Sequence, residues 1–585
     1  MANLGGLPHE LLEVILANAS LGPTDLANVA CTCRRFDRAV RSDLLWRIKF
    51  GQRWPHITMG RLEDLSLNWC DLYQMRVTCS SAVSSAVRSC SACFFHKTEI
   101  STNDFEKMLN LQFPLSFIQD ELERFCSSEA RCLTTQYYAR KALIFLQQKQ
   151  IMAELQEFLR RPEKEQSLVE GAVLIARYCN PMEDVRLTHV QAQISEIADK
   201  VRHLLYKMNP THPACNAGKG GKQMHNIALQ GQVLDALNKL LYQHLRFTGN
   251  EEDYYNPLNS YLHQVLRRRK GIPISMCILY AAIARCLGLH LEPVCFPSHF
   301  ILRWPQIDGA LEPKDFAYVD AYSGGSVQSA SVYRLARLEE SVTDASFASS
   351  STSAVLARMA NNLVILGRRN PGGDRTFQLA RSSLSLYLAL VPEDYQYRLL
   401  QARIYLHLCI DIEQVIESLQ QIHVVDPLQQ GIIVHLIEQA MERRAKPAGG
   451  TEVGVKRRMD SDTERVRFAI GLVMKHKRYD YMCVIYDWDV HCEMGQEWQR
   501  TMGVNRLPGS ANQPFYNVLV EDGSCRYAAQ ENLHLHPDPK PVSHPEVGRY
   551  FSAFLRTCYT LNPEMAALYP DDENVVKQLL SAASQ

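Results

Sequence analysis

The string FTGNEEDYYNPLNSYLHQVLRRRKGIPISMCILYAAIARCLGLHLEPVCFPSHFILRW, residues 247–304, decides the fold at the centre of this chain. It predicts two helices, Pro257–Arg269 and Met276–Leu287, separated by a tight turn. Pro273 is expected to end the first helix and Ser275 to cap the second, because a serine hydroxyl suits the N-cap position. Gly288 is expected to end the second helix. A helical pair followed by strands therefore organises the middle of the molecule.

The two strands are predicted over His299–Trp304 and Phe316–Asp320, the second within the string FAYVDAYSGG. If Trp304 pairs with Asp315, the antiparallel register places His299 opposite Asp320. Directly opposed residues have Cβ atoms about 5 Å apart, so the imidazole and the carboxylate can form a hydrogen bond. A helix N-terminus beside a His–Asp pair is the arrangement found in Cys-His-Asp transglutaminase and papain-like sites.

The sequence of this region resembles the SirB-type transglutaminase-like family, in the strings NPLNSYLHQVLRRRKGIPIS, FPSHFILR and VDAYSGG. The string EGAVLIARYCNP extends the resemblance back, and we place the domain at residues 166–338. In transglutaminases the helix N-terminus carries a cysteine nucleophile; the comparable position here is Ser275, and SirB-type proteins tend not to keep that cysteine. Cys277 lies two residues on, about 200° round the helix.

We therefore interpret Ser275, Cys277, His299 and Asp320 as the remnant of a catalytic site. The alternative is an active amidase or transglutaminase, with His299 as base, Asp320 as its orienting partner, and Ser275 or Cys277 as nucleophile.

The N-terminal string LGGLPHELLEVILANASLGPTDLANVACTCRRFDRAVRSDLLWRIKF predicts three short helices. A core this small is marginal alone and is typical of a module completed by a partner. The string resembles the F-box throughout residues 1–50, which implies binding to the Skp adaptor of cullin–RING ubiquitin ligases. The residues predicted to bind the adaptor, or to support those that do, are Leu7, Pro8, Leu11, Leu12, Ile15, Leu26, Val29, Phe36, Leu44 and Trp46.

Helices are predicted through residues 51–165 and again through 355–445. The spacing Cys90-x-x-Cys93-x-x-His96, with Cys79, resembles part of a zinc site, but structural zinc usually needs two separated ligand pairs, so we predict no metal. Leu390-Val391-Pro392 and Val425-Asp426-Pro427 repeat 35 residues apart, each after an amphipathic helix, which suggests tetratricopeptide-like hairpins. The stretch 446–462 is predicted to be a linker in which the basic trio 456–458 is solvated.

Residues 464–570 are rich in β-branched and aromatic residues and predict a small β-barrel. They resemble the HspQ/YccV-like family, once described as hemimethylated-DNA-binding. The stretch from Arg465 to Tyr569 contains eleven Lys or Arg and eleven Asp or Glu, so it has no excess positive charge with which to bind phosphates. We expect this barrel to bind protein, particularly through the loop Pro508–Phe515, and not nucleic acid; its aromatics Trp488, Trp498, Phe515 and Tyr516 line either a groove or the core.

The 585 residues include 46% hydrophobic side chains, 63 basic and 63 acidic ones. Zero net charge gives no general attraction to nucleic acid or anionic membrane, and no apolar run approaches the roughly 20 residues that span a bilayer. Eighteen cysteines without a recognisable secretion signal indicate reduced thiols in the cytosol or nucleus. The sequence thus predicts an α+β, mainly helical multidomain chain without cofactors. It would serve as the non-catalytic substrate-recognition subunit of a Skp–cullin–F-box ubiquitin ligase; a DNA-associated factor acting through the barrel is a further alternative.

Overall fold

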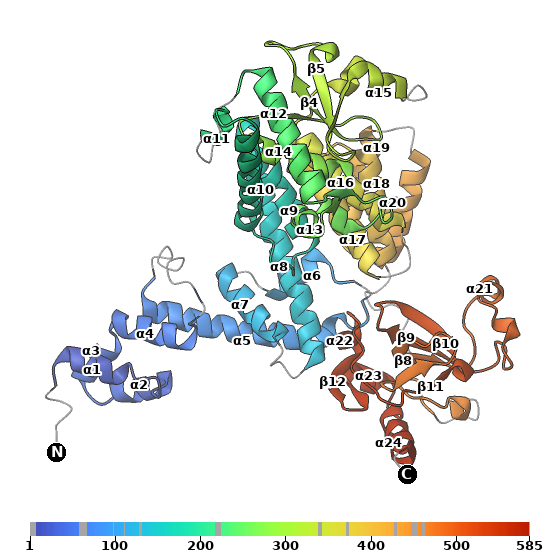
Figure 1. Ribbon diagram of the computed structural model, residues 1–585. Coiled ribbons are helices and arrows are strands. Elements are labelled where there is room, and N and C mark those ends of the chain that lie inside the picture. Colours follow the sequence, from blue (N-terminus) through green and yellow to red (C-terminus); the bar gives the residue numbers. More distant parts are fainter. Residues whose placement is uncertain are drawn as a thin grey trace.

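The computed structural model describes residues 7–55, 57, 67–97, 99–109, 112–127, 132–216, 224–336, 342–369, 374–425, 430–445, 454–458 and 463–583. The fold is a mainly helical α+β multidomain assembly, as predicted. A helical arm carries the F-box region at one end; an upper body and a separate β-rich domain lie towards its other end (Figure 1). No helix within the described ranges is both long enough and apolar enough to cross a membrane.

The F-box region contains four helices where three were expected: α1 His9–Leu16, α2 Pro23–Ala30, α3 Arg34–Val40 and α4 Asp43–Arg53. Its core is not closed on itself. The ring of Trp46 lies 5.0 Å from that of Tyr73, and the ring of Phe50 lies 5.6 Å from that of Trp69. Both partners belong to the next helix, so the arm completes a core that would be marginal alone.

The arm continues through α5 Trp69–Phe94, α6 Thr102–Leu109, α7 Leu115–Cys126 and α8 Leu133–Arg160. Helix α8 is 28 residues long and contributes to three hydrophobic cores. Leu133 packs on the β-rich domain, Tyr138 to Leu146 on the F-box and arm core, and Ile151 to Phe158 on the core of the upper body. This one helix therefore connects the three parts of the molecule.

The upper body is built around α14 Pro273–Cys286, which is apolar on all sides and buried along its first eight residues, as expected for a central helix. Its helices are α9 Leu168–Cys179, α10 Leu187–Met208, α11 Pro213–Asn216, α12 Ile227–Asn238, the π-helical η5 Lys239–His244, the 3-10 helix η6 Pro257–Ser260, α13 Leu262–Arg268 and α14 Pro273–Cys286. The first predicted helix is thus divided into η6 and α13. Its last helical residue is Arg268, one before the predicted end, and Arg269 follows in the left-handed conformation. Pro273, expected to end this helix, instead begins α14.

A four-stranded antiparallel sheet in the order β3-β4-β5-β6 lies beside α14. Its strands are β3 Glu292–Val294, β4 Ile301–Pro305, β5 Phe316–Asp320 and β6 Ser326–Ser329, followed by α15 Ala330–Ala336. A short parallel pair, β1 Thr248–Gly249 and β2 Lys270–Gly271, fixes the loop before η6. Short 3-10 helices η7 Pro313–Asp315 and η8 Asp344–Phe347 occupy the connections.

Five further helices follow as predicted: α16 Thr352–Arg369, α17 Asp374–Leu390, α18 Tyr395–Leu408, α19 Ile412–Val425 and α20 Gln430–Ala445. Helices α16 and α17 pack on α9, whereas α18–α20 form a small core of their own. Of the two repeated tripeptides, Leu390-Val391-Pro392 ends α17; Asp426 and Pro427 of the other lie outside the described residues.

The C-terminal domain holds a five-stranded antiparallel sheet in the order β10-β9-β8-β7-β11. The strands are β7 Val473–His476, β8 Met482–Asp489, β9 Phe515–Val520, β10 Cys525–Ala529 and β11 Leu533–Leu535, with the hairpin β12 Phe551–Leu555 and β13 Cys558–Leu561. Helices α21 Gln496–Thr501, α22 Val547–Tyr550, α23 Pro563–Leu568 and α24 Asp572–Ala583 complete this domain, with the 3-10 turns η10 Thr463–Arg465, η11 Val504–Arg506 and η12 Gln530–Asn532. A further 3-10 turn, η4 Glu163–Glu165, joins α8 to α9 in the upper body.

Candidate functional site: a His–Asp pair and an exposed F-box face

Helix α14 begins three residues earlier than predicted. Ile272 is the N-cap and Pro273 the first helical residue, which is where proline is preferred. The prediction that Ser275 is the N-cap is therefore wrong. Ser275 is the third helical residue, and its hydroxyl accepts a hydrogen bond of 3.1 Å from the backbone N–H of Ile272.

The register of the two strands also differs from the prediction. Trp304 pairs with Ala317 and not with Asp315, a shift of two residues, and β4 begins only at Ile301. A shift of two leaves every side chain on its predicted face, because the side-chain period of a strand is two. His299 consequently lies in the turn before β4, yet on the same side as Asp320 at the end of β5.

The predicted contact between His299 and Asp320 is confirmed. Nε2 of His299 lies 2.8 Å from Oδ2 of Asp320, and both side chains are largely buried. The hydroxyl of Ser323 donates to the same Oδ2 at 2.9 Å, and the backbone N–H groups of Tyr322 and Ser323 donate to Oδ1 at 3.0 and 3.1 Å. The carboxylate is thus held by four donors.

These donors lower the pKa of the Asp320 carboxyl group. Burial raises the pKa of Asp320, but the hydrogen bond and charge of His299, together with the Ser323 donors, outweigh it and hold the pKa below its ordinary value. Because the ionised carboxylate only accepts, Nε2 of His299 is the donor in this hydrogen bond. Nδ1 of His299 forms no hydrogen bond with another of the described residues.

The turn that presents His299 is held under strain. Ser298 has φ of +50°, a left-handed conformation that is uncommon outside glycine. The guanidinium of Arg358, on α16, donates to the carbonyl of Phe296 at 2.8 Å and to that of His299 at 2.7 Å. Arg358 is a positioning residue that the sequence reasoning missed; an arginine 59 positions away carries no local signal.

Ser275, predicted to occupy the nucleophile's position, is fully buried. Its hydroxyl donates to the carbonyl of Asn259 at 2.6 Å. Asn259 is the centre of a polar network, with hydrogen bonds to Asn250, Asp253, Tyr254 and Arg268. The string NPLNSYLHQVLRRRKGIPIS therefore has a structural reason: it ties η6, α13 and the start of α14 together.

Cys277, and not Ser275, is the side chain beside the His–Asp pair. Its Sγ lies 3.4 Å from the carbonyl oxygen of Phe300, and it is completely buried. Burial, reinforced by the charge of Asp320, raises the pKa of this thiol far above its ordinary value. A neutral, inaccessible thiol is a poor nucleophile. The site thus has a well-ordered base and orienting carboxylate, while both candidate nucleophiles are enclosed.

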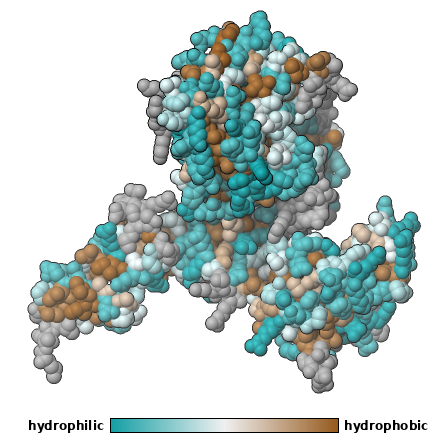
Figure 2. Space-filling model, viewed as in Figure 1, coloured by the Kyte–Doolittle hydropathy of each residue, from teal (hydrophilic) through white to brown (hydrophobic). Residues whose placement is uncertain are grey.

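The F-box region presents a second candidate site, an exposed apolar face. Leu11, Val14, Ile15, Leu44 and Ile48 keep between 39% and 69% of their surface exposed. They come from α1 and α4, and a brown apolar patch covers the end of the arm in Figure 2. Soluble proteins rarely expose a patch of this kind unless something binds there.

The ten residues predicted for adaptor binding divide into two groups. Leu12, Leu26 and Trp46 are buried core residues that can only support the face, whereas Pro8, Leu11, Ile15 and Leu44 are exposed and Leu7, Val29 and Phe36 are half-buried. Val14 and Ile48 were missed, although each lies three or four residues from a predicted member, the spacing that places residues on one helical face.

Comparison with known proteins bears on both sites. Residues 4–50 match the F-box-like family, 188–361 the transglutaminase-like superfamily, and 466–557 a family described as hemimethylated DNA-binding protein YccV like. The chain is 45% identical to F-box only protein 21 of Pongo abelii over 574 residues, 97% of this chain and 92% of that protein, and equally identical to the Homo sapiens protein over 582 residues. The chain belongs to the F-box only protein 21 family.

Part of the chain also resembles a bacterial protein: a UPF0162 protein of Xylella fastidiosa is 41% identical over 103 residues, 18% of this chain and 34% of that protein. No solved structure matches the chain.

The aromatic residues of the YccV-like region are mainly core. Trp488, Phe515 and Tyr516 are almost completely buried, and the half-buried Trp498 packs 5.9 Å from the ring of Tyr527. They do not line a groove. The long β8–β9 connection that carries α21 exposes two apolar side chains, Met494 and Met502.

Of the basic trio 456–458, Arg457 is exposed as predicted, whereas Lys456 and Arg458 form ion pairs. Lys456 Nζ lies 2.7 Å from Asp487 and 2.9 Å from Asp489, and Arg458 Nε lies 2.7 Å from the fully buried Asp572. These ion pairs anchor the segment before the sheet, and helix α24 after it, to the β-rich domain.

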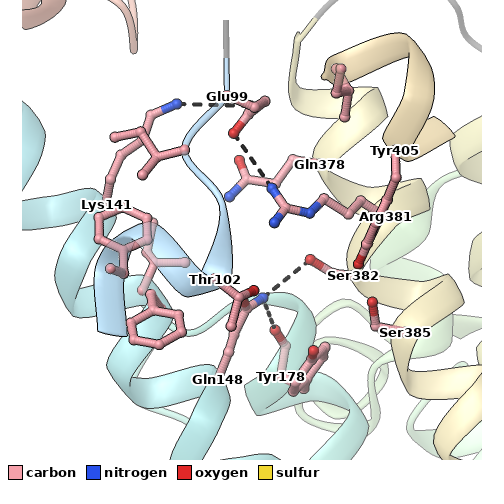
Figure 3. Close-up of a pocket in the computed structure, with 15 residues that line it drawn as sticks. Glu99, Thr102, Lys141, Gln148, Tyr178, Gln378, Arg381, Ser382, Ser385 and Tyr405 are labelled. Carbon is pink, nitrogen blue, oxygen red and sulfur yellow. Dashed lines mark hydrogen bonds and ion pairs between the residues drawn. The ribbon is translucent and has the colours of Figure 1, made fainter. Parts of the chain in front are cut away.

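A cavity of about 100 Å³ lies where the arm meets the upper body (Figure 3). The carboxylate of Glu99 lies 3.8 Å from Lys141 Nζ and 3.6 Å from Arg381, and Gln148 donates to Ser382. Pockets that hold a cofactor or drug-sized ligand usually measure roughly 300–1,000 Å³. The residues that line this small cavity connect helices of the arm and the upper body through ion pairs and hydrogen bonds, and they do not form a ligand site.

Proposed function

We propose that this F-box protein is the substrate-recognition subunit of a Skp–cullin–F-box ubiquitin ligase. The F-box face would dock the Skp adaptor, and through it the cullin and RING subunits, in the cytosol or nucleus. The upper body and the β-rich domain would hold a protein substrate near the ubiquitin carrier. Such a subunit acts by raising the effective concentration of the substrate at the carrier.

The observation that carries the proposal is the exposed apolar face of α1 and α4. The core beneath this face is complete without a partner, because α5 and α7 supply Trp69, Tyr73 and Phe117. Leu11, Ile15 and Leu44 therefore stay exposed on a folded support, which is the preorganised state that favours tight docking.

We also propose that the chain contributes no covalent chemistry. This is supported by the enclosure of Ser275 and Cys277 beside an otherwise well-formed His–Asp pair. We further propose that the YccV-like region binds protein, through the Met494 and Met502 side of the β8–β9 connection. Flexible methionine side chains suit varied protein surfaces, and the balanced charge of this region does not favour phosphates.

Reconstitution tests the proposal. Purified full-length chain mixed with Skp adaptor, cullin and RING protein should elute as one complex and support ubiquitin transfer to a captured substrate. Deleting the F-box would expose the aromatic residues of α5 and α7, so the matched negative control is Ile15→Asp, which changes only the exposed face. Failure of the intact chain to bind adaptor at micromolar concentration would overturn the proposal.

A further inference from the structure

A groove of about 430 Å³ lies between helices α16, α18 and α20, which stand together on one side of the upper body (Figure 1). Its volume falls within the range of roughly 300–1,000 Å³ that is usual for ligand pockets. Its lining includes Arg368 of α16, Ile432 of α20, and Gln396, Tyr397, Leu400 and Arg403 of α18. One cavity thus brings two arginines and two aliphatic side chains together.

The two arginines of the groove lack protein partners in the described part of the chain. Arg368 and Arg403 are both exposed, and neither forms an ion pair or a hydrogen bond with another described residue. Other arginines of the same helices are engaged: Arg398 donates to Gln421 at 3.3 Å, and Arg358 donates to two backbone carbonyls. The guanidinium groups in the groove therefore keep their N–H donors for a ligand or for water.

No acidic side chain is among the residues that line the groove. Helices α16 and α18 contain no Asp or Glu at all. The first acid of α20 is Glu438, six residues after Ile432 and so about 9 Å further along the helix axis. The three helices therefore present cations to the groove without an acid beside them.

Two carboxylates lie in the turn before α18, and both are engaged elsewhere. Asp394, the N-cap, accepts hydrogen bonds from the backbone N–H of Tyr397 at 3.2 Å and from the Tyr387 hydroxyl at 2.9 Å. Glu393 accepts from the Tyr395 hydroxyl at 3.1 Å. Their charges act on the groove from its end, but neither carboxylate forms an ion pair with an arginine of the groove.

The rest of the lining is largely uncharged and held in place. Leu400 is half-buried, and Ile432 keeps 47% of its surface exposed. The ring of Tyr397 packs 4.4 Å from that of Tyr387, and its hydroxyl donates to Asn361, which ties α18 to α16. Because these contacts form the groove before anything binds, little ordering is needed on binding.

Two unpaired guanidinium groups beside an apolar wall match one ligand chemistry. Guanidinium groups bind carboxylates through charge-assisted hydrogen bonds, and the wall can bury an aliphatic side chain. Nucleic acid fits less well, because its affinity comes from many phosphate contacts. We propose that this groove binds an acidic segment of the protein substrate that also carries an apolar side chain. The inference rests on the proposed role of the chain as a substrate receptor, and it names the substrate class.

Fluorescence anisotropy with defined probes tests the inference. A fluorescein-labelled Gly-Ser peptide that carries three glutamates and two leucines is titrated with the full-length chain. The same peptide with glutamines in place of glutamates, and a third with serines in place of leucines, are titrated beside it. The first peptide should bind most tightly, because it alone offers both the carboxylates and the apolar side chains.

The double variant Arg368→Gln with Arg403→Gln should weaken binding of the glutamate peptide by about 2- to 25-fold, since an exposed ion pair contributes about 1.4- to 5-fold. The matched control is Arg246→Gln with Arg285→Gln, two arginines of the same body that are also exposed and have no ion pair in the described ranges. The control should bind as the wild type does.

The apolar wall has its own variant. Ile432→Ser should weaken binding by about 3- to 12-fold, because about half of this side chain remains to be buried by a ligand. Val434→Ser is the control: Val434 is 43% exposed on the same helix but does not line the groove. Circular dichroism of every variant shows whether it is folded.

Equal binding of the glutamate and glutamine peptides, or no binding of either, would overturn the inference. So would an equal loss in the two double variants, since that result indicates diffuse charge attraction. A single-stranded oligonucleotide that binds more tightly than the glutamate peptide would identify a nucleic-acid groove instead. Adaptor binding is measured separately on the wild type: its absence, with the glutamate preference intact, would refute the proposed function and leave the groove standing.

Discussion

The double substitution Leu11→Ala and Leu44→Ala measures how much the exposed F-box face contributes to the affinity for the Skp adaptor. Burying a leucine fully stabilises by about 1.5–3 kcal/mol relative to leaving it exposed. Leu11 is 49% and Leu44 is 56% exposed in the free chain, so about half of that gain remains for a partner to supply. The pair should therefore weaken adaptor binding by about 1.5–3 kcal/mol, or about 10- to 150-fold in Kd.

Isothermal titration of the purified full-length chain with Skp adaptor gives the Kd, and circular dichroism gives the melting temperature. The matched control is Leu311→Ala with Leu335→Ala, two leucines that are 87% and 70% exposed in the upper body. The control should bind adaptor normally. A Kd within threefold of wild type for the F-box double variant, with unchanged melting, would refute the assignment of this face.

Three further outcomes are expected. A thiol-directed reagent analysed by mass spectrometry should modify the exposed Cys93 within minutes and Cys277 only after denaturation, since Cys277 is buried; equal rates would contradict its enclosure. Gly548→Ala should detach the β-rich domain from α8, because the added Cβ would come within 2.4 Å of the Leu133 carbonyl, and limited proteolysis would detect this as faster release of the domain. Asp320 has a lowered folded-state pKa, so its contribution to stability is present above pH of about 4–5 and is lost as pH falls through that pKa. The difference in urea unfolding between wild type and Asp320→Asn should accordingly shrink between pH 6 and pH 3; a constant difference would show that the carboxylate's charge contributes nothing.

The sequence predicted the strand over Phe316–Asp320 with its observed bounds and brought His299 to Asp320 despite a two-residue error in register. The error was harmless because a shift of two keeps the same face. The start of α14 was predicted wrongly because Ser275 was taken as the N-cap and Pro273 as the end of the preceding helix. Proline is preferred at the first helical position, and this preference would have located the start correctly.

Other features depend on contacts between distant residues, and no local pattern carries them. Leu11 and Leu12 are chemically identical neighbours, yet one is exposed and the other is buried. The burial of Trp46 depends on Tyr73, and the order of the His299 turn depends on Arg358. Periodicity locates a helix, but only the assembled fold determines which side of it faces outward.

Helix α8 sets the orientation of the upper body relative to the arm. Between Leu146 and Ile151 it passes from the core of the arm to the core of the upper body. One residue inserted there would turn the upper body by about 100° about the helix axis and move it by about 1.5 Å; seven would move it by about 10 Å with a turn of only about 20°. The direction in which the turn carrying His299 faces, relative to the F-box end, therefore depends on the number of residues in α8. Variants with inserts of one, four and seven residues would change that direction and that distance separately.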